Sequence, residues 1–272
     1  FVGGTQLIIA FAILMILGIP DAPFESIAAA LGGGMIWGLA LILLFWTLRT
    51  EQIGRVVPVS QTSPVFAAIL GVVFLGEHLE WWGWLAVALV VAGAAIVSAD
   101  PQQILSGGFK KIYLWVVLAA ALIGVAQVML KVSSDDLGVW HNMSIRGTGL
   151  FLTLALPVLR PSVAKDLVVF ITKRKTAIPV LITEGIGPIF GNGFLLLALA
   201  NGPVSLVSAL LGTRPIFILL ITLAFAPIAK RALNEQFTRA DVVTKVVSTV
   251  AVVTGVVIIS LACFIWMRRN RC

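Results

Sequence analysis

The sequence predicts an all-α integral membrane protein with about nine transmembrane helices. Of its 272 residues, 60% are hydrophobic and 11% are charged, and the mean hydropathy is +1.08. A soluble domain has about 25% charged residues. A soluble fold of this size could not bury so much apolar surface, so lipid must cover part of it. The apolar residues also form runs of about 20, which is the length that an α-helix needs to span the hydrocarbon core.

Nine such runs follow one another along the chain. They are 1–19, 26–48, 56–76, 81–98, 112–130, 139–158, 177–200, 203–228 and 243–266. The connectors between them hold most of the charged residues. Transmembrane strands are not expected, because the runs are too long and lack the alternation of membrane barrels. The connector 160–175 is longer than the others, and its amphipathic part, Val163–Thr172, is expected to lie along the membrane interface.

Composition and residue placement exclude several function classes. Cys263 and Cys272 cannot form a disulfide framework, and with only His78 and His141 they do not make a zinc site, so we expect no metal and no cofactor. We attribute the net charge of +7 to topological signals between spans, so no nucleic-acid partner is expected. An embedded enzyme would need a nucleophile with a base, or a metal cluster, at one depth. No His, Cys or Asp lies deep in a run, so we expect no enzyme.

The chain contains a weak internal repeat. Residues 47–64 align without gaps with residues 198–215, so that Pro64 meets Pro215. The motif LGEHL at 75–79 then meets LNEQF at 233–237, after a seven-residue insertion in the second copy.

Two repeats are therefore predicted. The first is 1–98, with four helices, and the second is 112–266, with five. Phe1 lies inside an apolar run without an initiator Met, so we expect a fragment that lacks its first helix, and ten helices in the full-length protein. Five helices are an odd number, so the two repeats have opposite orientations. Inverted repeats are typical of secondary carriers, which bind their substrate near the midplane.

These features resemble the EamA-type family of the drug/metabolite transporter superfamily. Segment 56–97 is similar to the end of an EamA repeat, with a Pro-centred helix, an apolar stretch that closes on LGE, and a Gly-containing last helix. Lys131 and Arg146 are similar to further marks of that family. The absent first helix and the insertion before Asn234 depart from the pattern. The resemblance implies ten helices and export of amino acids, sugars, nucleotide precursors or drugs. It also implies a cavity lined by 26–48, 56–76, 177–200 and 203–228.

Deep ionisable residues are the first site candidates. Glu184 is the only acidic residue well inside an apolar run, and Arg146 and Arg214 are the only basic ones. Such a group costs roughly 2.5–3.5 kcal/mol on insertion scales, so it needs a partner or water. In one interpretation Arg214 binds a substrate carboxylate or phosphate, and Glu184 binds an amine or a coupling proton. In the other, the two form a salt bridge between helices. The interpretations are compatible if substrate competes with the bridge.

Asn192 shares a helix face with Glu184 and Pro188 and joins the predicted site. The other predicted substrate-binding residues are Trp37, Ser60, Gln61, Ser63 and Thr213. The predicted hinge residues are Gly34, Pro64, Gly187, Pro188 and Pro215. Two alternatives stay open. The Ser60–Ser63 patch lines the cavity or bonds carbonyls of its own helix, and Trp37 stacks on a ligand or packs the core.

Two further expectations concern the interface. Arg146 lies early in its helix, and we expect its side chain to reach back to the interface as an anchor. Glu77 and Glu235 follow apolar runs, and we expect them to act as caps or hinge contacts outside the cavity. The charge rule and the family resemblance imply opposite orientations, so orientation is left open.

The sequence thus predicts a multi-pass protein of a bacterial or archaeal plasma membrane that exports a small polar metabolite, such as an amino acid, by alternating access. The alternative is a proton-coupled multidrug exporter of the same fold. The expected partners are a small-molecule substrate, the lipid bilayer and coupling protons, and the oligomeric state is left open.

Overall fold

The computed structural model describes a helical chain. The described residues are 2–50, 56, 59–60, 62–77, 81–98, 112–180, 182, 187–211 and 217, and no strand occurs among them. The chain divides into two compact units. Unit 1 consists of Phe1–Leu43 with Val125–Gly202, and unit 2 of Leu44–Gly124 with Pro203–Cys272. Each unit combines segments of both predicted repeats, and the repeat boundaries stay a prediction.

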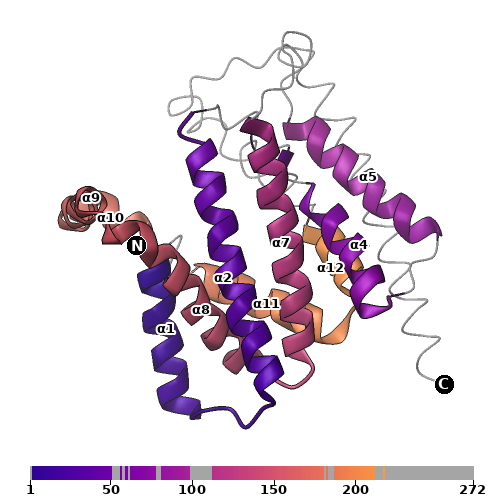
Figure 1. Ribbon diagram of the computed structural model, residues 1–272, viewed down its shortest axis with the longest axis horizontal. Coiled ribbons are helices and arrows are strands. Elements are labelled where there is room, and N and C mark those ends of the chain that lie inside the picture. The colour runs from indigo at the N-terminus through magenta and orange to yellow at the C-terminus, as the bar shows by residue number, and fades with distance from the viewer. Residues whose placement is uncertain are drawn as a thin grey trace. The chain divides into compact units, whose positions relative to one another are not determined.

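Unit 1 holds the larger number of described helices (Figure 1). They are α1 (Val2–Leu17), most of α2 (Phe24–Thr47), the second half of α7 (Ile112–Ser134), α8 (Val139–Ala155), the 3₁₀ turn η1 (Leu156–Leu159), α9 (Pro161–Thr172), α10 (Arg174–Val180) and α11 (Gly187–Asn201). Helix α8 packs on α1 and α11. Small residues make these approaches close, since a Cβ added at Gly3 of α1 would lie 3.1 Å from the Leu154 Cβ.

Unit 2 contains α4 (Ser63–Leu75), α5 (Trp81–Ser98) and α12 (Val204–Leu211), together with the last residues of α2 and the first half of α7. Helix α12 packs on both α4 and α5, and its Val204 and Val207 are buried. Helix α4 ends at Gly76, whose φ of 63° is a left-handed conformation that glycine adopts without strain. The turn that follows brings Glu77 back beside Gly71, because a Cβ at Gly71 would lie 2.8 Å from Glu77 Oε2.

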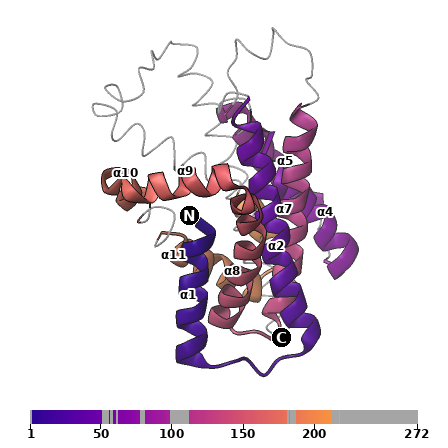
Figure 2. The same cartoon turned by 60° about the vertical axis from the view of Figure 1, so that its left-hand side comes forward.

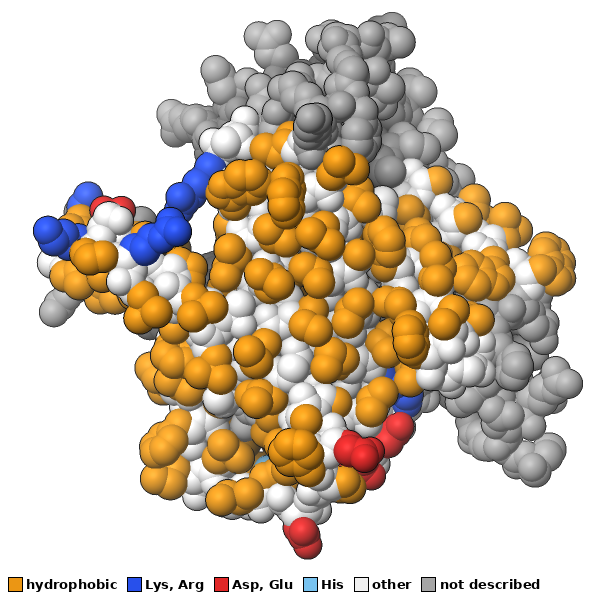
Figure 3. Space-filling view, in the orientation of Figure 1, with side chains coloured by type: hydrophobic (Ala, Val, Ile, Leu, Met, Phe, Trp, Pro, Cys, Tyr) orange, Lys and Arg blue, Asp and Glu red, His pale blue; other side chains and the backbone are white. Residues whose placement is uncertain are grey.

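Three helical segments of the described chain are long and apolar enough to cross a membrane. They are Phe24–Thr47, Leu114–Ser134 and Val139–Leu159. Large hydrophobic side chains are also widely exposed, including Ile16 at 80% and Phe74 at 72%. Figure 3 shows such side chains over the visible face, with the charged ones mainly at its edges. Lipid would cover a surface of this kind. The predicted run 243–266 lies outside the described residues, so the count of nine spans and the inverted arrangement stay predictions.

Candidate functional site

Helices α2 and α8 approach each other until their backbones touch. A Cβ added at Gly34 of α2 would lie 2.1 Å from the Arg146 carbonyl oxygen, and one added at Gly149 of α8 would lie 2.1 Å from the Leu31 carbonyl oxygen. Any side chain at either position would therefore overlap a main-chain atom, and only glycine fits. The contact brings the side of α8 that faces α2 close to the α2 backbone.

A hydrogen bond extends the same contact by one turn. Thr153 Oγ1 donates to the Met35 carbonyl oxygen at 3.1 Å, and a Cβ at Gly38 would lie 2.8 Å from the Thr153 Cβ. Gly34 and Gly38 are four residues apart, which is the spacing that lets transmembrane helices pack closely. Gly34 therefore has a packing role in this structure, and its predicted hinge role stays a prediction.

Arg146 is held inside this contact. Its side chain is only 5% exposed, and its guanidinium lies 4.6 Å from the centre of the Trp37 ring. It is the eighth residue of the 21-residue candidate span Val139–Leu159, which places it about 10 Å along that span. The expected interfacial anchor is therefore wrong, because α2 lies so close to α8 that the side chain packs against Trp37. A cation–π contact of this kind stabilises by about 0.5–2 kcal/mol.

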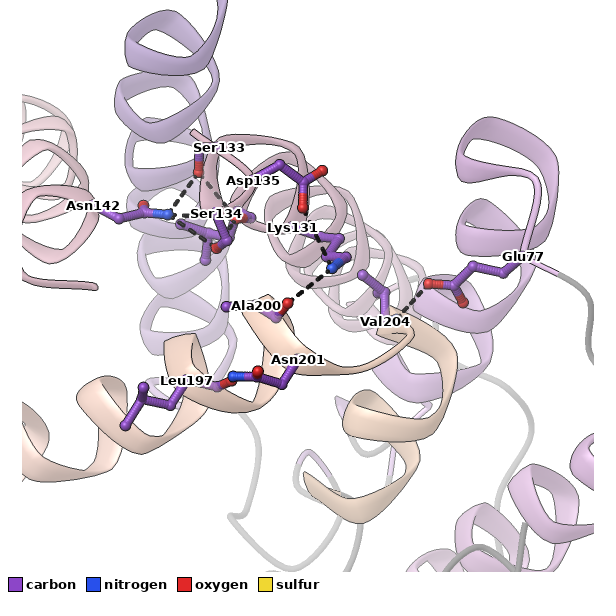
Figure 4. Close-up of polar contacts among 11 residues, drawn as sticks. Glu77, Lys131, Ser133, Ser134, Asp135, Asn142, Leu197, Ala200, Asn201 and Val204 are labelled. Atoms are coloured by element: carbon purple, nitrogen blue, oxygen red, sulfur yellow. Dashed lines mark hydrogen bonds and ion pairs between the residues drawn. The ribbon is translucent and has the colours of Figure 1, made fainter. Parts of the chain in front are cut away.

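The turn of α8 before Arg146 is polar and buried. Asn142 and Ser144 are 0% exposed. Asn142 Nδ2 donates to Ser133 Oγ at 2.8 Å and to Ser134 Oγ at 3.1 Å, as Figure 4 shows. Within the described residues, Asn142 Oδ1 and Ser144 Oγ have no hydrogen-bond partner. Buried polar atoms nearly always have a hydrogen-bond partner in native proteins. These two atoms of α8 are therefore available to bind water or a polar ligand.

The end of α7 is tied to two neighbouring elements of unit 1. Lys131 Nζ lies 3.5 Å from Asp135 Oδ1 and donates to the Ala200 carbonyl oxygen, also at 3.5 Å, at the C-terminal end of α11 (Figure 4). Ser26 Oγ of α2 donates to Asp136 Oδ2. A cation near a helix C-terminus is favourable, but Asp135 is 65% exposed, so this ion pair contributes little to stability.

Only part of the predicted site falls on described residues. Trp37 and Gly34 lie beside Arg146, whereas Asn192, Gly187 and Pro188 lie on α11. Ser63 and Pro64 form the first turn of α4, where proline needs no N–H partner. In the same polar patch, Thr62 Oγ1 donates to the Val59 carbonyl oxygen at 2.8 Å. For Thr62 this agrees with the alternative that the patch bonds carbonyls of its own helix. Outside the described residues are Gln61, Glu184, Thr213, Arg214 and Pro215.

Glu77 fulfils the capping role expected for it. In unit 2 its Oε1 accepts a hydrogen bond of 2.5 Å from the backbone N–H of Val204, the first residue of α12 (Figure 4). A carboxylate at a helix N-terminus satisfies a backbone donor that has no partner inside the helix and interacts favourably with the helix dipole.

Glu77→Ala is expected to lower the stability of the protein by about 1–2 kcal/mol, because it leaves the first N–H of α12 without this acceptor. Glu77→Gln should lower it less, since the amide oxygen still accepts the bond. The unfolding midpoint, followed by tryptophan fluorescence in detergent, measures the effect. Asp166→Asn, at an exposed position of α9, is the control. Equal midpoints for Glu77→Ala and Asp166→Asn would contradict the cap.

Comparison with known proteins finds a family that the first part of the sequence resembles. Residues 1–99 match the sequence profile of the EamA-like transporter family. The match covers 99 of the 272 residues, so over this part the chain is similar to the EamA-like transporter family. The resemblance predicted from the sequence is thereby confirmed, and EamA-type transporters are integral membrane proteins, in agreement with the apolar helices described above.

Two curated relatives are named as transporters. An uncharacterized transporter in the cobO 3' region of Sinorhizobium sp is 38% identical over 65 residues, which are 24% of this chain and 46% of that protein. The uncharacterized transporter YwfM of Bacillus subtilis (strain 168) is 40% identical over 47 residues, which are 17% and 16% of the two chains. The matched parts thus span less than half of either relative. Both names indicate a transporter, and neither indicates an enzyme.

A solved structure shares the fold. One crystal structure, described only as that of a protein, superposes with a TM-score of 0.66 over 96% of this chain and 86% of the other, at 16% sequence identity. At this identity the likeness concerns the fold alone.

Proposed function

We propose that the chain forms a secondary transporter that exports a small polar metabolite bearing a carboxylate, such as an amino acid, by alternating access. The observation that carries this proposal is the burial of Arg146 against Trp37 in the candidate span Val139–Leu159. One turn away lies Asn142 Oδ1, which has no hydrogen-bond partner among the residues that the structure describes. A positive charge at membrane depth is costly, and it is typical of a substrate or ion pathway. The EamA-like profile and the names of the relatives support the transporter class.

Arg146 adds a described residue to the site predicted from the sequence. Its guanidinium presents up to five N–H donors in a plane, which suits a carboxylate better than a point charge does. The Trp37 ring holds that plane in place from one side. In this proposal Glu184, Asn192 and Arg214 complete the site, with Glu184 binding the substrate amine or a coupling proton.

Solute counterflow in proteoliposomes tests the function. Proteoliposomes that contain the full-length protein would be loaded in turn with amino acids, sugars, nucleosides and a cationic dye. Proteoliposomes with the Arg214→Ala variant would be measured in parallel. We expect saturable exchange of a carboxylate-bearing solute, reduced by about tenfold or more in Arg214→Ala, because loss of a charge-assisted hydrogen bond costs about 1.5–3 kcal/mol. Exchange of the dye alone, at the same rate in Arg214→Ala, would contradict the proposal of a metabolite exporter and would favour a multidrug exporter.

A further inference from the structure

Helix α9 begins where a membrane-spanning helix ends. The candidate span Val139–Leu159 has 21 residues, so it is about 31 Å long. The hydrocarbon core of a bilayer is about 30 Å thick, so Arg160 lies at its boundary. Arg160 is extended, with φ −77° and ψ 124°, as residues before proline usually are, and Pro161 starts α9. Figure 2 shows α9 running across the direction of α8 and α1 of the same unit.

Helix α9 has two distinct faces. Val163, Leu167, Phe170 and Ile171 follow one another at the spacing of a single helical face, whereas Ser162 lies on the opposite side, half a turn away from Ile171. No residue of α9 is buried, and Ile171 remains 51% exposed. The main contacts of α9 are with η1 and α10, and Val163, Leu167 and Phe170 of its apolar face are only half-buried.

Basic residues flank the two ends of α9 and lie on the side away from its apolar face. Arg160, Lys165 and Lys173 are exposed at the start, in the first half and directly after the end of α9. The segment 160–175 contains five Lys or Arg and one acidic residue, Asp166, which gives a net charge of 5 − 1 = +4. Basic side chains beside an apolar face are complementary to a surface in which anionic headgroups lie above acyl chains.

We propose that α9 is an interfacial helix that binds anionic lipid. Its apolar face lies in the boundary between headgroups and acyl chains, and Arg160, Lys165 and Lys173 contact the headgroup phosphates. The inference is independent of the transported substrate, because it rests on the place of α9 at the end of a span, on its two faces and on its charge. A soluble partner or a second copy would not require the helix to begin at the membrane boundary.

The depth of the two faces is the first test. Ile171→Cys and Ser162→Cys would be made in the Cys263→Ser, Cys272→Ser chain, labelled with an environment-sensitive fluorophore, and reconstituted in vesicles with brominated acyl chains. We expect quenching and a blue-shifted emission at position 171 and a water-exposed probe at position 162. Equal quenching at both positions would overturn the interfacial placement. A probe at position 171 that is shielded from the brominated chains, and that becomes quenched only when the protein is diluted into more lipid, would assign the apolar face to a second copy of the chain.

The charge requirement is the second test. Quenching at position 171 by brominated phosphatidylglycerol would be compared with quenching by brominated phosphatidylcholine. A basic residue close to an anionic surface changes the local lipid preference by about fivefold, and salt weakens it. We expect the preference to be lost in Arg160→Gln, Lys165→Gln, Lys173→Gln, and to persist in Arg49→Gln, which removes an exposed charge elsewhere. A preference that is unchanged in the triple variant would show that headgroups are not recognised.

Discussion

Gly34→Ala and Gly149→Ala are each expected to destabilise the protein by about 3 kcal/mol, since overpacking at a contact that cannot relax reaches this size. The reason is geometric. Each new Cβ would stand 2.1 Å from a main-chain carbonyl oxygen, that of Arg146 for Gly34 and that of Leu31 for Gly149. A carbonyl oxygen inside a helix cannot rotate away, so α2 and α8 must separate, and the Thr153 hydrogen bond and the Trp37 contact of Arg146 weaken with them.

Glycine substitutions without a steric conflict provide the matched control. A Cβ at Gly4 of α1 or at Gly191 of α11 meets no atom within 4 Å. Gly4→Ala and Gly191→Ala should therefore unfold at the wild-type temperature or slightly above it, because alanine favours the helix by up to about 1 kcal/mol. Folded yield from the membrane and the unfolding midpoint in detergent measure all four variants. If Gly34→Ala behaves like Gly4→Ala, then α2 and α8 are not in backbone contact.

The helices were predictable because lipid imposes a simple rule on the sequence. A run of about 20 apolar residues is long enough to span, and the runs near α1, α2, α5, α7 and α8 agree with the helix bounds to within a few residues. The amphipathic segment Val163–Thr172 is likewise confirmed as a helix, α9 (Pro161–Thr172). Run length predicts the spanning helices and periodicity predicts α9, so no knowledge of neighbouring helices was needed.

The partners of buried polar residues were not predictable in the same way. Glu77 was expected to cap a helix, but its acceptor role for Val204 joins residues 127 positions apart. The Asn142 contacts with Ser133 and Ser134 depend on the turn between α7 and α8, whose geometry the apolar runs do not specify. For Arg146 a signal was present, since Gly34 and Gly38 have the spacing of a close helix crossing. That spacing favours burial of the facing side chain over an interfacial anchor.

Arg146→Gln is expected to reduce transport of a carboxylate-bearing substrate by about 30-fold or more, because truncating one partner of a buried charge pair costs about 2–5 kcal/mol. Arg146→Lys keeps the charge but loses the planar fork, so its loss should be smaller. Trp37→Leu removes the ring below the guanidinium, and Trp37→Phe retains a weaker one. A double-mutant cycle on the free energy of unfolding should therefore give a coupling energy of about 0.5–2 kcal/mol between Arg146 and Trp37.

The substrate itself separates a binding role of Arg146 from a purely structural one. An analogue in which an amide replaces the carboxylate has no anion for the guanidinium to bind. If Arg146 binds the carboxylate, Arg146→Gln should discriminate far less between acid and amide than the wild type does, while the transport of the amide changes little. If Arg146 only fixes α8 against α2, both substrates should be transported more slowly by the same factor, and the unfolding midpoint should fall. Equal losses for acid and amide would remove Arg146 from the binding site and leave the carboxylate to Arg214.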